Sequence, residues 1–323
     1  MMHDDTIPPD VQPRPQDYPF DLDQVLSAIV RVRAQIPDDG FTTPVLGSER
    51  AGSGIVIDAD GLVLTIGYLI LEAESIWLTT VDGRAVPGHA LAYDGDTGFG
   101  LVQVLGRLGV PALEFGDSTA LAIGEAMILA AAGGRSQSVR TRLVGRQYFA
   151  GYWEYLLEDA LYVAPHNPNW GGAGLIDAHG RLVGVGSLAL QQRVAEDRSL
   201  NLNMVVPIDL VKPILESLRR LGRTDRPPRP WLGLYAGEED DAVIVHGLAE
   251  GGPAETAGIQ LGDHILAVGD APVTDLRQLW QGIWASGSAG TTIRLRIARG
   301  TKTRTRDVPS ADRMAFLRAP RLQ

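Results

Sequence analysis

The sequence predicts a mainly β protein followed by a smaller α+β unit, on three observations. Short apolar runs alternate with Asp-Gly-type turns over the first two thirds of the chain. Helical periodicity appears only late in that region, and a stiff, polar, proline-rich segment at residues 223–229 then separates it from a compact C-terminal stretch. Short strands at this spacing are typical of an all-β barrel or sandwich, and such a proline-rich segment is typical of an interdomain linker.

The strand prediction depends on runs that are bounded by turn residues. Gly54–Ile57 leads into the turn Asp58–Gly61, and Leu62–Thr65 follows directly. Comparable runs are Ser75–Thr80, Leu101–Leu105 and Leu182–Val185. Because apolar, β-rich runs separated by such turns favour antiparallel pairing, we expect all of them to be strands.

One amphipathic helix is expected before the linker. Its apolar residues recur at i, i+3, i+4 and i+7, and Gly222 provides a C-terminal stop. The apolar face consists of Leu210, Val211, Ile214, Leu215, Leu218 and Leu221. Beyond the linker, the pattern reads strand, strand, helix, strand, helix, strand.

The chain therefore divides into five parts. Residues 1–22 are rich in proline and aspartate, so they form either a disordered arm or a docking arm that uses Tyr18 and Phe20. Residues 23–222 form the β domain and 223–229 the linker. Residues 230–311 form the α+β unit, and 312–323 a tail.

Composition excludes several classes of function. The chain has 45% hydrophobic and 21% charged residues, which is a globular composition, and a formal net charge of −10, which argues against a nucleic-acid partner. It contains no cysteine, so a disulfide framework, a cysteine nucleophile and a thiolate metal site are excluded. No cofactor or metal motif is present, and we expect neither.

The first 20 residues carry acids and prolines where a secretory signal would need a basic start and an apolar stretch. The longest apolar run, Ala126–Gly134, is about half of the roughly 18–20 residues that span a bilayer. We therefore expect a cytoplasmic protein without a membrane span, or a periplasmic one if the true start site differs.

Two stretches resemble the HtrA/DegP family of trypsin-like serine proteases, which carry a C-terminal PDZ domain. Gly52–Asp58 with Gly61–Thr65 resembles the opening strands of that protease domain, and Val205–Lys212 its closing segment. The PDZ resemblance rests on Trp231–Leu234, Gly252–Ala254, Ala257–Ile259, Leu261–Asp263 and Ile265–Val268. The resemblance implies two six-stranded-type β-barrels of the trypsin fold followed by an α+β PDZ domain.

The catalytic positions that the resemblance identifies do not hold catalytic residues. The position of the histidine base holds Tyr68, a phenol that accepts protons poorly at neutral pH. The orienting carboxylate is replaced by Gly98, and the nucleophilic serine by Trp170. The residue that should donate the first oxyanion N–H is Pro168, which has none. No Ser, Thr or Cys occurs in Leu161–Gly180.

Trp170 and Tyr68 can be interpreted in two ways. The pair either fills the vacated cleft, since an empty pocket would cost cavity energy, or forms an aromatic floor for a peptide that is held but not cut. In the PDZ unit, the resemblance implies that the loop Trp231, Leu232, Gly233 and Leu234 binds a peptide carboxylate. Leu279 and Ile283, on the helix that starts near Thr274, are then expected to line the apolar pocket or to belong only to the core.

We therefore expect a catalytically inactive protease homologue that binds peptide C-termini or unfolded segments as an adaptor, chaperone or regulator. The alternative is an active HtrA-type serine endopeptidase in protein quality control that uses residues not identified here. The resemblance also implies a homotrimer, with Tyr18 and Phe20 as candidate contacts. A mixed oligomer with an active paralogue is a further possibility.

Overall fold

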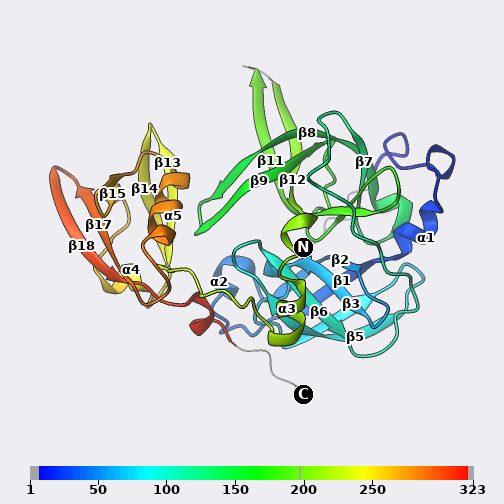
Figure 1. The fold of residues 1–323 in the computed structure, drawn as a ribbon, viewed down its shortest axis with the longest axis horizontal. Helices are drawn as coiled ribbons and strands as arrows, with labels where there is room; N and C mark the ends of the chain where they lie inside the picture. Colours follow the sequence, from blue (N-terminus) through cyan, green and yellow to red (C-terminus); the bar gives the residue numbers. More distant parts are fainter. Residues whose placement is uncertain (1–6, 196–197, 319–323) are drawn as a thin grey trace. The chain divides into compact units, whose positions relative to one another are not determined.

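In a computed structural model, which describes residues 7–195 and 198–318, twelve strands form two closed six-stranded barrels, and further strands form a C-terminal sheet (Figure 1). This mainly β architecture confirms the predicted fold class. The protein divides into two compact units, one of which contains both barrels. Residues 148–158, at the far end of a hairpin from the second barrel, cluster with the C-terminal unit instead.

The first barrel has the strand order β1-β2-β3-β6-β5-β4, all antiparallel neighbours. Valine, isoleucine and leucine side chains fill the barrel, and Val30, Val32 and Leu64 are fully buried. The predicted runs therefore lie in strands. These are β1 (Ile29–Gln35), β2 (Glu49–Val56), β3 (Leu62–Ile66), β4 (Ser75–Thr79), β5 (Ala85–Tyr93) and β6 (Phe99–Val104).

The second barrel has the order β10-β11-β12-β9-β8-β7 around a core that includes Leu129, Leu161 and Val183. Its strands are β7 (Ala126–Ala130), β8 (Ser138–Gly151), β9 (Tyr155–Ala164), β10 (Gly174–Ile176), β11 (Leu182–Ala195) and β12 (Arg198–Pro207). The two barrels meet where Ser53 N–H donates to the Gly171 carbonyl (2.8 Å) and Ala132 N–H donates to Ser53 Oγ (3.0 Å). This contact places the turn at residues 170–172 of the second barrel against strand β2 of the first.

The expected helix before the linker is shorter than its periodicity suggests. A 3₁₀ turn, η4 (Ile208–Leu210), comes first, and α3 (Leu215–Leu221) ends at Gly222, which has a left-handed φ of +69°. Pro213 lies between them and disfavours helical backbone at Lys212, which separates the two pieces. The other elements of this unit are α1 (Leu22–Ser27), α2 (Thr43–Leu46), η1 (Pro15–Asp17), η2 (Gly67–Leu69) and η3 (Gly134–Gln137).

The described part of the N-terminal arm, residues 7–22, lies on the protein. Ile7 is buried, and Arg140 of β8 donates its N–H to the Val11 carbonyl (2.8 Å). The rings of Tyr18 and Phe20 are 5.3 Å apart, and Phe20 lies close to Gly180. Residues 7–22 thus pack on their own chain, residues 1–6 lie outside the described range, and docking of the arm onto a partner stays a prediction.

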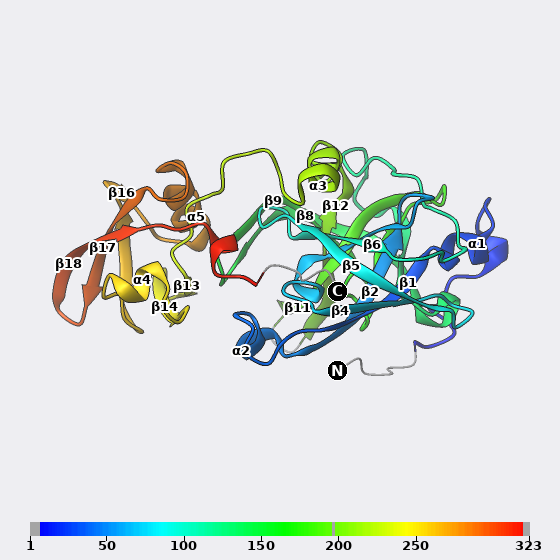
Figure 2. The same ribbon diagram turned by 90° about the horizontal axis from the view of Figure 1, so that it is seen from below.

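The C-terminal unit has the sheet order β13-β14-β15-β17-β18, with β16 paired to β15. Figure 1 labels the five strands of this order, and Figure 2 labels β16. Helix α5 packs on β13 and β15, and Asp275 caps it by accepting the Gln278 N–H. The elements are β13 (Leu234–Glu239), β14 (Ala242–Leu248), α4 (Pro253–Thr256), β15 (His264–Val268), β16 (Ala271–Pro272), α5 (Leu276–Ala285), β17 (Thr292–Arg299), β18 (Lys302–Pro309) and η5 (Arg313–Ala315). The predicted tail is part of this unit as far as residue 318.

Candidate functional site

The structure brings the predicted triad positions together at the junction of the two barrels. Gly67 N–H donates to the Gly98 carbonyl (2.7 Å), which places Gly98 beside the turn that carries Tyr68. The Tyr68 hydroxyl in turn donates to the Ser187 carbonyl of β11 (2.9 Å). The positions of Tyr68 and Gly98, two of the three that the resemblance assigned to a catalytic triad, are therefore neighbours in space.

Trp170 lies against Tyr68 in the same place. Burial raises the pKa of Tyr68 far above its usual value, and the nearby Trp170 side chain offsets this only in part. The phenol donates its proton to the Ser187 carbonyl (2.9 Å). A phenol in this setting stays protonated at neutral pH.

The turn that follows Trp170 requires glycine. Gly172 has a φ of +75°, and a Cβ at this position would lie 1.9 Å from the Ser53 carbonyl oxygen. Its N–H donates to the Gly186 carbonyl (2.9 Å). The second barrel therefore has a tight turn that requires glycine directly after Trp170, the residue at the position of the nucleophile.

Buried polar side chains hydrogen-bond the backbone of the turn that carries Tyr68. Arg50 donates to the carbonyls of Tyr68 (2.8 Å) and Leu71 (3.2 Å), and to Thr42 Oγ1 (2.8 Å). The Glu72 carboxylate accepts the N–H groups of Phe41 (3.0 Å) and Thr42 (2.7 Å), and the Thr42 hydroxyl (2.6 Å). Burial lowers the pKa of Arg50 to about 10, and the charge of Glu72 opposes this shift. Sequence reasoning did not identify this network.

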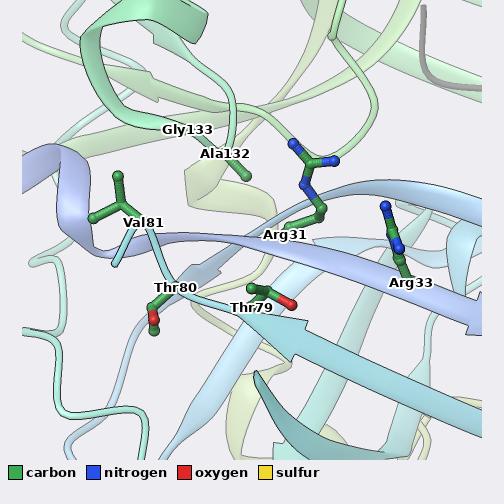
Figure 3. A pocket seen from close by; sticks show the side chains of 7 residues that line it. All are labelled: Arg31, Arg33, Thr79, Thr80, Val81, Ala132 and Gly133. Carbon is green, nitrogen blue, oxygen red and sulfur yellow. The ribbon is translucent and has the colours of Figure 1, made fainter. Parts of the chain in front are cut away.

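Among the pockets of the described residues, two lie on the barrel unit outside the triad positions. One, of about 310 Å³, is lined by Arg31 and Arg33 of β1, by Thr79, Thr80 and Val81, and by Ala132 and Gly133 (Figure 3). Arg31 and Arg33 stand two residues apart and so project from one face of the strand. The other, of about 490 Å³, lies between the N-terminal arm and the second barrel and includes Tyr18 and Arg140.

In the C-terminal unit, three consecutive N–H groups converge on one carboxylate. Leu232 donates to both oxygens of Glu154 (2.9 and 3.1 Å), while Gly233 (2.7 Å) and Leu234 (3.0 Å) donate to Oε1. Gly233 has a φ of +75°, a conformation that side chains rarely adopt. We call these three N–H groups the carboxylate cradle.

Trp231 corrects the predicted set of loop residues. Its N–H donates to the Ala311 carbonyl (3.0 Å) rather than to the cradle, and its buried ring packs on Phe316, 4.7 Å between centroids. The cradle therefore begins at Leu232. Leu279 and Ile283 are fully buried in one apolar cluster that also contains Leu232, Leu234 and, from the β8–β9 hairpin, Leu156.

Two residues at the cradle were missed by sequence reasoning. Glu154 is its occupant, and the charge of Arg313 on η5 acts on the Glu154 carboxylate. Arg229, next to the loop in sequence, instead lies over the Trp284 ring (4.3 Å). A usable signal for Glu154 was the aromatic content around it, which is high for a hairpin end. The stretch contains Tyr148, Phe149, Tyr152, Trp153 and Tyr155.

Among the described residues, no group of three or more His, Asp and Glu side chains could hold a metal ion. Within the same part of the chain, no helix is long and apolar enough to cross a membrane.

Comparison with known protein families identifies two domains in this chain. Residues 52–185 match the trypsin-like peptidase domain, and residues 230–309 match the PDZ domain. The chain is 24% identical to "Serine protease Do-like HtrA" of Bacillus subtilis, over 90% of this chain and 71% of that protein. It is 26% identical to a "Probable periplasmic serine endoprotease DegP-like" of Pseudomonas putida, over 81% of this chain but only 56% of that protein.

Solved structures agree at the level of the fold. The structure of "HtrA-type protease AlgW with decapeptide" matches 93% of this chain and 99% of its own, with 19% identity and a TM-score of 0.53. The "serine endoprotease from Yersinia pestis" matches 91% and 98%, with 20% identity and a TM-score of 0.52. The chain therefore carries a trypsin-like peptidase domain followed by a PDZ domain, and it is similar to HtrA- and DegP-like proteases.

Proposed function

We propose that this protein is a catalytically inactive HtrA-like protease homologue that binds peptide C-termini or unfolded segments through its PDZ domain. It would act as an adaptor, a chaperone or a regulator. The observation that carries the first half of the proposal is the buried Tyr68 phenol at the triad positions, which donates to the Ser187 carbonyl (2.9 Å) and has Trp170 beside it. A protonated phenol and an indole occupy the place where proteolysis needs a general base and a nucleophile.

The oxyanion site adds independent support. Pro168 cannot donate an N–H where the resemblance places the first oxyanion donor, and Gly98 has no carboxylate to orient a base. Loss of a triad lowers kcat by about 10⁶, and the residual catalysis depends on an oxyanion hole. Both sources of rate acceleration are thus compromised in this chain.

The second half of the proposal is supported by the carboxylate cradle. Three N–H groups at 2.7–3.1 Å from the Glu154 carboxylate are a geometry suited to a peptide terminus. We further propose a homotrimer, or a mixed oligomer with an active paralogue. Size-exclusion chromatography with light scattering measures the first, and co-purification from the native cell measures the second.

A fluorophosphonate probe tests inactivity directly. We expect no covalent labelling of the intact protein and no cleavage of casein, with an active serine protease as the positive control. Mass spectrometry locates any modified residue. Labelling of a serine would overturn the inactive assignment and favour the alternative, an active endopeptidase, which is the activity named for the relatives above.

A further inference from the structure

The end of the β8–β9 hairpin follows the path of a peptide ligand along the PDZ domain. This segment, Tyr148–Glu158, is called the hairpin tip below. Trp153 forms an antiparallel bridge with Tyr235 of β13, and Ala236 N–H donates to the Tyr152 carbonyl (2.8 Å). With Glu154 in the cradle, the tip runs antiparallel beside β13 for three consecutive residues. An added strand with a carboxylate at its end is how PDZ domains bind peptides.

The tip also contacts the helical side of the groove. The indole N–H of the fully buried Trp280 on α5 donates to the Gly151 carbonyl (3.0 Å). Glu158 accepts from Arg277 (2.5 Å) and from Gln281 (2.7 Å). The Arg277 guanidinium lies over the Tyr148 ring (4.8 Å).

Apolar burial accompanies these polar contacts. Leu156 is 7% exposed and belongs to the PDZ core cluster. Trp153 stacks on Tyr155 with 5.5 Å between ring centroids, and Tyr152 lies 6.2 Å from Tyr235. The hairpin tip therefore accepts the hydrogen bonds of the carboxylate cradle and contacts helix α5. Its Leu156 is part of the apolar core of the PDZ domain.

We propose that the hairpin tip is a built-in ligand of the PDZ groove, in which the Glu154 side chain takes the place of a peptide's terminal carboxylate. A peptide C-terminus and the tip cannot hold the same N–H groups at once, so a peptide binds only after the tip leaves. The competing peptide in this statement rests on the proposed function; the occupancy of the groove does not.

Covalent connection gives the tip an advantage over free peptides. Strands β8 and β9 tether it to the same chain, and such a tether supplies an effective concentration of about millimolar. A peptide that arrives at micromolar concentration must overcome that excess. Loss of the Glu154 contacts should reverse the balance, because it leaves the three N–H groups of the carboxylate cradle without their acceptor, and three hydrogen bonds lost together should change the equilibrium at least tenfold.

Hydrogen exchange on the full chain tests occupancy without any peptide. We expect the amides of Leu232–Leu234 to be protected in the wild type and to exchange at least tenfold faster in Glu154→Ala. Glu158→Ala, which loses the Arg277 and Gln281 contacts, should give a smaller acceleration. Asp159→Ala is the matched control, because this neighbouring residue pairs with Arg146 and lies outside the tip. Equal exchange in wild type and Glu154→Ala would overturn the proposal.

Peptide capture tests the competition. The probe is a fluorescein-labelled synthetic peptide of residues 148–154 with a free C-terminus, measured by fluorescence polarisation. We expect at least tenfold tighter binding to Glu154→Ala than to wild type, and wild-type affinity for Asp159→Ala. Equal affinity for wild type and Glu154→Ala would contradict the built-in ligand. An array of unrelated decapeptides with free C-termini separates the two proposals: if only the tip peptide binds Glu154→Ala, the built-in ligand stands and peptide capture in general fails.

Discussion

Glu154 is a carboxyl whose environment makes tip docking depend on pH. Burial raises its pKa to about 7, and the N–H groups of the cradle and the charge of Arg313 oppose that rise without cancelling it. Tyr235 faces the same carboxyl, and burial raises its pKa as well. An exposed glutamate has a pKa of about 4.3. The docked tip therefore binds a proton that the undocked tip releases between about pH 4.5 and 7.

The sign of this linkage gives the first prediction. Docking should be strongest at low pH, should weaken as the pH rises through that window, and should be constant above it. Wild-type capture of the tip peptide should therefore improve between pH 5.5 and pH 8. Glu154→Gln removes the titrating group while keeping its shape, so its capture should vary much less over the same range. A steeper pH dependence in Glu154→Gln than in wild type would exclude Glu154 as the group responsible.

Trp170 decides between the two interpretations of the aromatic pair. If it fills the former cleft, Trp170→Ala should lower the free energy of unfolding by about 2 kcal/mol, because the side chain is half-buried and full burial would give about 3–5. Urea denaturation measures this. Trp77→Ala, at a side chain that is 49% exposed, is the matched control and should cost under about 0.5 kcal/mol. Equal effects would favour a floor for bound peptide.

At the scale of elements, the buried network of Arg50, Thr42 and Glu72 shows how the short 3₁₀ turn that carries Tyr68 is held. Arg50 of β2 and Glu72 share Thr42 as a partner, and together they fix the segments around Phe41 and Tyr68. Satisfied buried polar networks specify one conformation, whereas removal of one charge leaves the other without compensation.

This network gives the third prediction. Glu72→Gln should lower the free energy of unfolding by about 2 kcal/mol, since it weakens three hydrogen bonds to a charged acceptor and leaves Arg50 buried without its counter-charge. Glu74→Gln, two residues away and exposed, serves as control and should be near neutral. A Glu72→Gln protein as stable as the control would show that the network positions the loop without stabilising the fold.

The same scale shows what the sequence could predict. Leu62–Thr65 reads as a strand because turn residues bound it, and β3 has nearly those limits. The positions Tyr68, Gly98 and Trp170 were predicted from the order of the motifs, and in the structure they lie close together. By contrast, Glu154 lies 78 residues before Leu232, and no local pattern links a hairpin end to a distant loop. Trp231 was assigned to the cradle by motif, but the pairing with Ala311 that turns its N–H away depends on the tail.

At the scale of the whole molecule, the hairpin tip changes what a domain deletion means. Tyr148–Glu158 belongs to the same compact unit as Arg226–Arg318, although it lies within the barrel part of the sequence. Removal of residues 226–323 alone would therefore uncover Leu156 and take away the ring contact of Tyr152 with Tyr235. Exposed apolar surface of this kind promotes association.

We predict that a chain ending at Asp225 associates into large particles, and that shortening its hairpin restores solubility. The shortened form replaces residues 149–157 with an Asn-Gly turn, which is suited to a two-residue hairpin connection. Light scattering at increasing protein concentration measures association, and near-ultraviolet circular dichroism checks that the barrels stay folded. If the chain ending at Asp225 scatters no more than its shortened counterpart, the tip does not need the PDZ domain as cover. In that case the contacts of Leu156 and Glu154 would be too weak to exclude a competing peptide.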